Sequence, residues 1–137
     1  MKRWNMLVGM LYAGLLCACA APPYRPVSMD KTAHVRFVNF EKPDICVSGH
    51  RFTLTPDSSG NVSVPAGQPV HLIGGYWRNS SYCFPAVKFV PQAGLTYDVV
   101  NDVRAERCMV NVMLHDASSQ YGLRVEPSVN ATHICPR

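Results

Sequence analysis

The side chains of this 137-residue chain that could carry out chemistry are five histidines and six cysteines. Metal centres usually need such residues in close pairs, a few positions apart along the chain. Beyond residue 19 the cysteines are separated by 37, 25 and 27 positions, and the histidines at 34, 50, 71, 115 and 133 show no ligand spacing. We therefore predict no metal site and no cofactor.

A nucleophile paired with a base is equally hard to find. Ser48 and His50 stand close together in a predicted turn, and His115 precedes Asp116. The fold brings catalytic pairs together, so adjacency along the chain adds little. No Gly-x-Ser-x-Gly, His-Glu-x-x-His, P-loop or dinucleotide-binding glycine pattern is present. We expect a protein that is not an enzyme and assign no catalytic residue.

One segment carries residue types that anchor recognition surfaces. Residues 74–84, GGYWRNSSYCF, combine two glycines with aromatic side chains and an arginine on a predicted loop. Tyrosine, tryptophan and arginine dominate the energetics of many interfaces. The predicted partner-binding residues are Tyr76, Trp77, Arg78 and Tyr82. The alternative is that Tyr76, Trp77 and Phe84 plug one end of the domain.

The elements that must position these residues are predicted to be strands. Residues 34–40, HVRFVNF, and 51–55, RFTLT, alternate in the manner of strands, and 56–60, PDSSG, form a turn. Residues 84–90, 95–103 and 107–114 read as a three-stranded meander joined by the tight turn PQAG. No helical period runs through the chain after residue 30.

These strands predict the fold class. About seven to eight short strands follow one another at intervals near ten residues, which is typical of an all-β sandwich or barrel. We predict a small antiparallel β-sandwich that is stabilised by disulfides, with residues 34–137 as its single domain.

The N-terminus has the layout of a secretory signal. Lys2 and Arg3 precede an apolar run at residues 6–16, and the small residues of CACAA follow. This apolar run is too short to cross a bilayer, which takes about 20 residues of helix. We predict that residues 1–18 are removed as a signal peptide.

The sequence Leu16-Cys17-Ala18-Cys19 resembles the lipobox of bacterial lipoproteins. The resemblance implies that Cys19 is lipidated and becomes the first residue of the mature chain. Ala20 follows it, where an aspartate commonly retains such proteins in the inner membrane, so the resemblance implies the outer membrane. The alternative is ordinary cleavage after Ala18, Ala20 or Ala21. If Cys19 is lipidated, residues 19–33 are the lipidated N-terminus and an extended, proline-containing tether.

Four cysteines remain for the domain, an even number that predicts two disulfides in an oxidising compartment. The candidates are Cys46, Cys83, Cys108 and Cys135. Four cysteines allow three pairings. We favour Cys83 with Cys108, since Cys83 enters the first strand of the predicted meander and Cys108 lies in its third, so that the two could meet across the core. Cys46 would then pair with Cys135 and hold the tail to the first half of the chain.

Two further stretches resemble exported proteins. NVSVPAGQPV is similar to a turn of transthyretin-like β-sandwich modules, and FVPQAGLTYDV is similar to a strand–turn–strand of small bacterial envelope lipoproteins. These likenesses imply an architecture and bring no catalytic residues.

Composition limits the partners. The chain has 13 Lys and Arg against 9 Asp and Glu, a net charge of +4. Removal of Lys2 and Arg3 leaves 11 against 9, or +2, so we expect no nucleic-acid partner. We expect a lipoprotein of the bacterial cell envelope that is held in the membrane by its lipid and docks on another envelope protein. A ligand-binding or inhibitor module is the alternative, and a hydrolase of cell-wall or surface polymers is a distant third.

Overall fold

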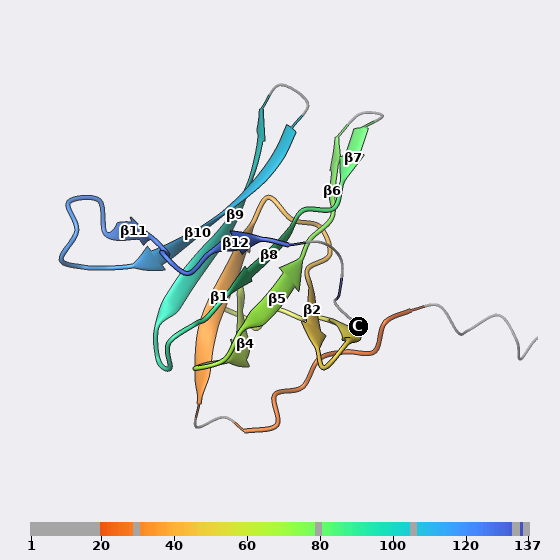
Figure 1. Ribbon diagram of the computed structural model, residues 1–137, viewed down its shortest axis with the longest axis horizontal. Coiled ribbons are helices and arrows are strands. Elements are labelled where there is room, and N and C mark those ends of the chain that lie inside the picture. Colours follow the sequence, from red (N-terminus) through yellow and green to blue (C-terminus); the bar gives the residue numbers. More distant parts are fainter. Residues whose placement is uncertain (1–19, 29–30, 79–80, 105–106, 133–134, 136–137) are drawn as a thin grey trace, which may run out of the picture.

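The structure is a computed structural model that describes residues 20–28, 31–78, 81–104, 107–132 and 135. The predicted signal peptide and the predicted lipidation site, Cys19, lie outside these residues. In the part described the chain is all-β, with two five-stranded sheets and a separate hairpin (Figure 1). Within the same residues, no helix is long and apolar enough to cross a membrane.

The first sheet contains, from edge to edge, β11 (Leu123–Val125), β10 (Arg107–His115), β9 (Thr96–Arg104), β1 (Thr32–Val38) and β4 (Asn61–Pro65). The second sheet contains β12 (Asn130–Ala131), β8 (Ala86–Phe89), β5 (Val70–Ile73), β2 (Asp44–Val47) and β3 (His50–Thr53). The hairpin pairs β6 (Tyr76–Arg78) with β7 (Ser81–Cys83).

The all-β class is confirmed, but two details of the prediction were wrong. The structure has twelve strands where seven to eight were expected, because several strands of two to four residues are too short to show alternation. The sheets are also not wholly antiparallel, since β1 pairs with β9 in parallel, with Val35 opposite Tyr97. This pair joins segments about 60 residues apart, so it cannot be predicted from a turn in the sequence.

The predicted meander was wrong as well. Its first strand, β8, belongs to the second sheet, while β9 and β10 belong to the first. The turn at residues 91–94 therefore carries the chain from one sheet to the other. The reason lies in the side chains that flank this turn: Phe89 and Tyr97 face one another from opposite sheets, with ring centroids 5.3 Å apart.

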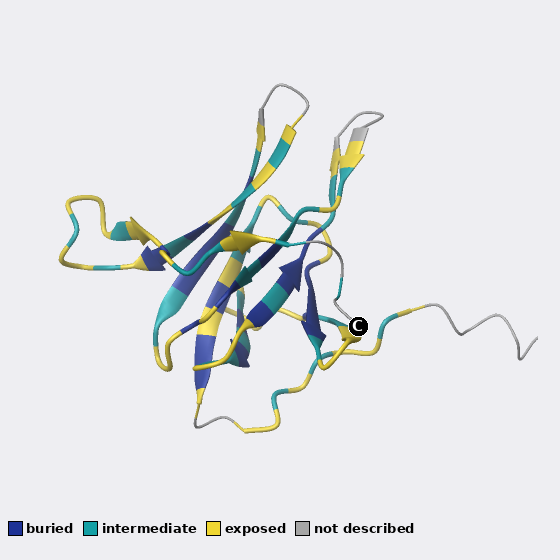
Figure 2. Cartoon of the chain, viewed as in Figure 1, coloured by how far each residue is buried: buried dark blue, intermediate teal, exposed yellow. Residues whose placement is uncertain are grey.

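The two sheets share one apolar core (Figure 2). Alternate residues of each strand point inward, so the inner faces bury Val35, Val99 and Val112 from the first sheet against Ile45 and Leu72 from the second. Full burial of each such side chain stabilises the fold by roughly 1.5–3 kcal/mol. The buried Tyr97 is satisfied too, because its hydroxyl accepts a hydrogen bond from the Gln92 N–H at 3.0 Å.

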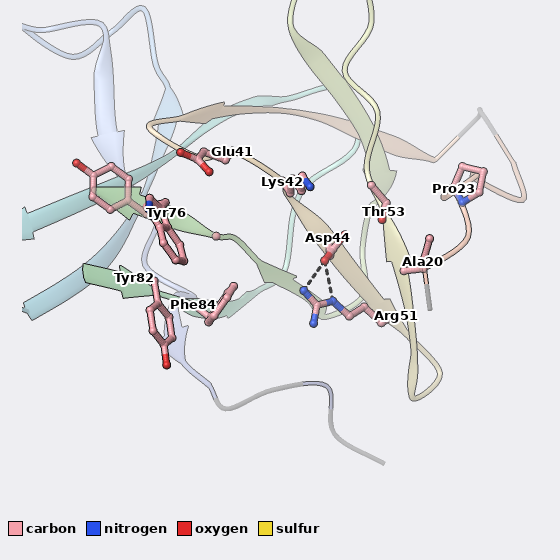
Figure 3. Close-up of a pocket in the computed structure, with 13 residues that line it drawn as sticks. Ala20, Pro23, Glu41, Lys42, Asp44, Arg51, Thr53, Tyr76, Tyr82 and Phe84 are labelled. Atoms are coloured by element: carbon pink, nitrogen blue, oxygen red, sulfur yellow. Dashed lines mark hydrogen bonds and ion pairs between the residues drawn. The ribbon is translucent and has the colours of Figure 1, made fainter. Parts of the chain in front are cut away.

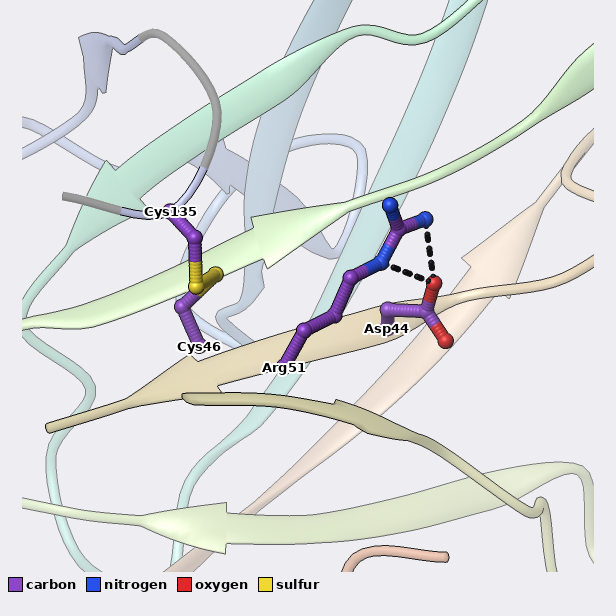
Figure 4. The surroundings of a disulfide bond; sticks show 4 residues. All are labelled: Asp44, Cys46, Arg51 and Cys135. Atoms are coloured by element: carbon purple, nitrogen blue, oxygen red, sulfur yellow. Dashed lines mark hydrogen bonds and ion pairs between the residues drawn. A yellow bond between two sulfur atoms is a disulfide. The ribbon is translucent and has the colours of Figure 1, made fainter. Parts of the chain in front are cut away.

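Two disulfides complete the domain, and their pairing is the one we favoured. Cys46 is bonded to Cys135, with 5.5 Å between their Cα atoms (Figure 4). Cys83 is bonded to Cys108, with 6.3 Å between their Cα atoms. The expected reason was wrong for the second pair, because Cys83 lies in the separate β6–β7 hairpin. Disulfides persist outside the reducing cytoplasm, so these bonds indicate an extracytoplasmic location.

Candidate functional site

An open groove of about 890 Å³ lies at the β2–β3 end of the second sheet (Figure 3). One wall is the N-terminal segment, with Ala20 and Pro23, and the opposite wall is the β6–β7 hairpin with Tyr82 and the following Phe84. The floor between them comes from β2, β3 and the loop that precedes β2. We call this the aromatic groove.

The hairpin wall has two faces because successive residues of a strand point to opposite sides. Trp77 lies opposite Tyr82 in the register, and Tyr76 lies opposite Cys83. The Tyr76 face is the one tied to β10, through the bond from Cys83 to Cys108. The Trp77 face carries Tyr82 and continues to Phe84.

Three aromatic rings on that second face form a continuous exposed surface. The Trp77 and Tyr82 rings stack with centroids 5.8 Å apart and an interplanar angle of 15°, and Tyr82 meets Phe84 at 5.7 Å. The three residues are 59%, 64% and 58% exposed. We call Trp77, Tyr82 and Phe84 the aromatic row. Trp77 and Phe84 are therefore exposed, whereas the alternative interpretation expected them to be buried as a plug at one end of the domain.

Of the four predicted partner-binding residues, the structure brings Tyr76, Trp77 and Tyr82 to the groove. Arg78 ends β6. The hairpin leaves the second sheet at Gly74, where the Phe40 ring crosses the backbone so closely that a Cβ atom would overlap it. A glycine is therefore required where the chain turns away to form this wall.

An ion pair occupies the groove floor. The buried Asp44 carboxylate accepts a hydrogen bond from Arg51 Nε at 2.7 Å, and the same oxygen contacts a terminal nitrogen of that guanidinium (Figures 3 and 4). Both residues sit on neighbouring strands, β2 and β3. The Asp44 carboxylate is therefore paired in a salt bridge that joins β2 to β3, and it is not available as a free acid or base.

The N-terminal wall is bonded to the domain. The Tyr24 N–H donates to the Thr53 carbonyl at 2.8 Å, and the Thr53 N–H donates to the Pro22 carbonyl at 2.9 Å. The Tyr24 ring packs edge-on against Phe52, with centroids 6.0 Å apart. Residues 22–24 belong to the stretch predicted to be an extended tether, and in the structure they are hydrogen-bonded to the edge strand β3 as a short cap.

A second polar cluster, which the sequence did not reveal, lies on the outer face of the first sheet. Arg36 donates to both carboxylate oxygens of Asp98, at 2.9 and 2.6 Å, and His115 Nε2 lies 3.0 Å from one of them. Burial alone would raise the pKa of Asp98, but these hydrogen bonds and the Arg36 charge hold it below its ordinary value. Asp98 itself is buried.

This cluster is relevant to the hydrolase alternative, which needs a histidine and an acid that converge in a cleft. His115 and Asp98 do converge, but they lie outside the residues that line the aromatic groove. Both Asp98 oxygens are already engaged by partners on β1 and β10. The arrangement joins three strands and gives no support to hydrolysis.

Within the described part of the chain, no group of three or more His, Cys, Asp or Glu side chains could hold a metal ion. No protein-family model matches the chain, and neither the curated proteins nor the solved structures contain a significant match to it.

Proposed function

We propose that this chain is a lipid-anchored, non-enzymatic protein of the bacterial cell envelope that docks on another envelope protein. The lipobox-like Leu16-Cys17-Ala18-Cys19 supports the anchor. The two disulfides support an extracytoplasmic domain. The single observation that carries the docking role is an exposed, preformed surface at one end of the domain.

This surface, which we call the hairpin end, consists of the β6–β7 hairpin and the neighbouring ends of β9 and β10. In Figure 1 the two hairpins project together from the same end of the molecule, and the bond between Cys83 and Cys108 joins them. Val103 and Met109 are exposed in these neighbouring ends of β9 and β10. A disulfide limits the motion of such hairpins, which lowers the entropy lost on binding.

Cell fractionation tests the anchor. Cys19→Ser should move the protein from the membrane fraction to the soluble fraction, while Cys17→Ser, two residues away, should leave it in membranes. Ala20→Asp should shift the anchored protein toward the inner membrane in a host that uses that rule. Unchanged membrane recovery of Cys19→Ser would refute the anchor.

In-cell cross-linking of a C-terminally tagged chain tests the docking role. After solubilisation, we expect one envelope protein in a stoichiometric amount with the wild type. Met109→Glu places a charge in the hairpin end and should abolish recovery of that protein. Tyr121→Glu, at an exposed position away from this end, is the matched control. Recovery of the wild-type chain alone would refute docking.

A ligand-binding or inhibitor role is the second candidate, and the volume of the aromatic groove favours it. A groove of 890 Å³ is within the size range of small-molecule sites. This role predicts that a sugar or peptide ligand raises the melting temperature of the purified protein, whereas a pure docking role predicts no change.

A further inference from the structure

We propose that the aromatic row, Trp77, Tyr82 and Phe84, is a second membrane contact that rests in the lipid–water interface beside the anchor. The inference rests on the proposed lipidation of Cys19 and goes beyond it. It assigns this face of the β6–β7 hairpin to the bilayer and leaves the rest of the hairpin end, the neighbouring ends of β9 and β10 with Val103 and Met109, to the protein partner.

The chemistry of the row suits a lipid surface. Tryptophan and tyrosine concentrate at membrane interfaces because an amphipathic ring can bury its apolar body and keep its polar edge in water. Single exposed apolar side chains are common on soluble proteins, but here three rings touch in succession. Trp77 and Tyr82 stack on one another, and both line the groove.

The position of the aromatic row in the fold also favours contact with the membrane. Ala20 lines the same groove as Trp77 and Phe84, and the proposed acyl chains begin at the preceding residue, one Cα–Cα step of about 3.8 Å away. A free tether of about ten residues would let the domain stand roughly 30 Å from the bilayer. The bonds that join Pro22 and Tyr24 to Thr53 remove that freedom. The anchored domain therefore has its groove at the membrane surface.

Charge contributes little to this contact. The rim carries Glu41 as well as Lys42, and Arg51 is already paired with Asp44. Opposite charges at the rim give no net attraction for anionic headgroups. We therefore expect the contact to depend on the rings and to be insensitive to the anionic lipid content of the bilayer.

The chain provides its own reporter. It has two tryptophans, Trp4 and Trp77, and Trp4 lies in the predicted signal peptide. The full chain with Trp4→Phe, isolated from membranes and reconstituted into phosphatidylethanolamine–phosphatidylglycerol vesicles, reports on Trp77 alone. The vesicles carry bromine, which quenches tryptophan, either near the headgroup end or at the far end of the acyl chains.

We expect Trp77 emission to shift to shorter wavelength on reconstitution and to be quenched most by bromine near the headgroup. Quenching should be the same when phosphatidylglycerol is left out. The matched control adds Trp77→Phe and Tyr121→Trp, which moves the reporter to an exposed turn on the side of the molecule away from residues 20–28 in Figure 1. That reporter should show neither the shift nor the quenching.

Flotation with the vesicles and the acyl mass on Cys19 test the anchor separately. A chain that floats while Trp77 stays unquenched overturns the membrane contact and leaves the proposed anchor intact. Shielding of Trp77 from a water-soluble quencher without quenching by lipid also overturns it, since a protein would then cover the row. Equal quenching at positions 77 and 121 overturns the assigned orientation. If the chain does not float with the vesicles, the proposed anchor is refuted, and the membrane contact that rests on it is refuted as well.

Discussion

Asp98 joins three neighbouring strands of the first sheet through its two carboxylate oxygens. Arg36 reaches it from β1 and His115 from β10, while Asp98 itself lies on β9. The parallel β1–β9 pair has no turn to hold it together. The bidentate contact, whose geometry fits a carboxylate well, thus reinforces a parallel strand pair formed between segments about 60 residues apart.

This contact predicts a specific dependence of stability on acid. The pKa of Asp98 is lowered in the fold, so the ionised carboxylate stabilises the fold above its ordinary pKa of about 3.9. This stabilisation is lost as pH falls from there through the lower folded pKa. Asp98→Asn should flatten the pH dependence of the unfolding free energy in that window. At neutral pH it should cost about 1–2 kcal/mol, because Arg36 is half exposed.

Denaturant unfolding between neutral and acidic pH measures this effect. Arg36→Gln and the double variant complete a double-mutant cycle that isolates the coupling between the two residues. If the Asp98→Asn variant kept the acid slope of the wild type, the lowered pKa of Asp98 would not be a source of that slope.

At the scale of the elements, the Cys83–Cys108 disulfide joins the β6–β7 hairpin to the β9–β10 hairpin at one end of the domain. Cys83 and Cys108 close a loop of 25 residues, and Cys46 and Cys135 close one of 89 residues that contains strands of both sheets. By chain-entropy estimates these loops are worth about 3.5 and about 4.6 kcal/mol.

Paired serine variants should separate these effects. Replacing Cys83 and Cys108 should raise amide hydrogen exchange in β6 and β7 and leave the core strand β9 near Val99 protected. Replacing Cys46 and Cys135 should cost more stability and loosen β2 and the tail. Uniform loss of protection in the first variant would show that the hairpin end and the core unfold as one unit.

The strand elements also show what local sequence can predict. Alternation identified β1, β9 and β10, because inward residues such as Val35 and Val99 follow a period of two. It could not tell whether the turn at residues 91–94 closes a hairpin or crosses between sheets, since both use the same turn residues. The burial of Asp98 could not be predicted for a related reason: it comes from neighbours on β1 and β10, which the sequence did not place beside it.

At the scale of the whole molecule, the N-terminal segment belongs to the domain. Prolines at 22, 23 and 26 suggested an extended spacer, and the residues are indeed extended, but the sequence could not show that they dock on β3. The aromatic segment 74–84 was predicted to be a loop, whereas the structure forms the β6–β7 hairpin there. Glycines and clustered aromatics are local signals, and they singled out the segment but not its strands. Its position opposite Ala20 depends on tertiary structure.

Tyr24 is the side chain that holds this segment. Tyr24→Ala removes the ring contact with Phe52 and should cost about 1–2 kcal/mol of unfolding free energy. It should also speed hydrogen exchange at the Tyr24 and Thr53 amides, which bond across the cap. Tyr24→Phe keeps the ring and should behave like the wild type. Unchanged exchange in the alanine variant would mean that the backbone bonds alone hold the segment.

The connectivity of the disulfides has a consequence for how the chain matures. The Cys83–Cys108 bond is nested inside the Cys46–Cys135 bond, so neither joins the first two cysteines of the domain. A chain threaded N-terminus first into an oxidising compartment exposes Cys46 and Cys83 before their native partners arrive. Rapid oxidation would then link the wrong pair. Maturation of this protein therefore requires either that the sheets assemble before the thiols are oxidised or that a disulfide isomerase exchanges the first bond.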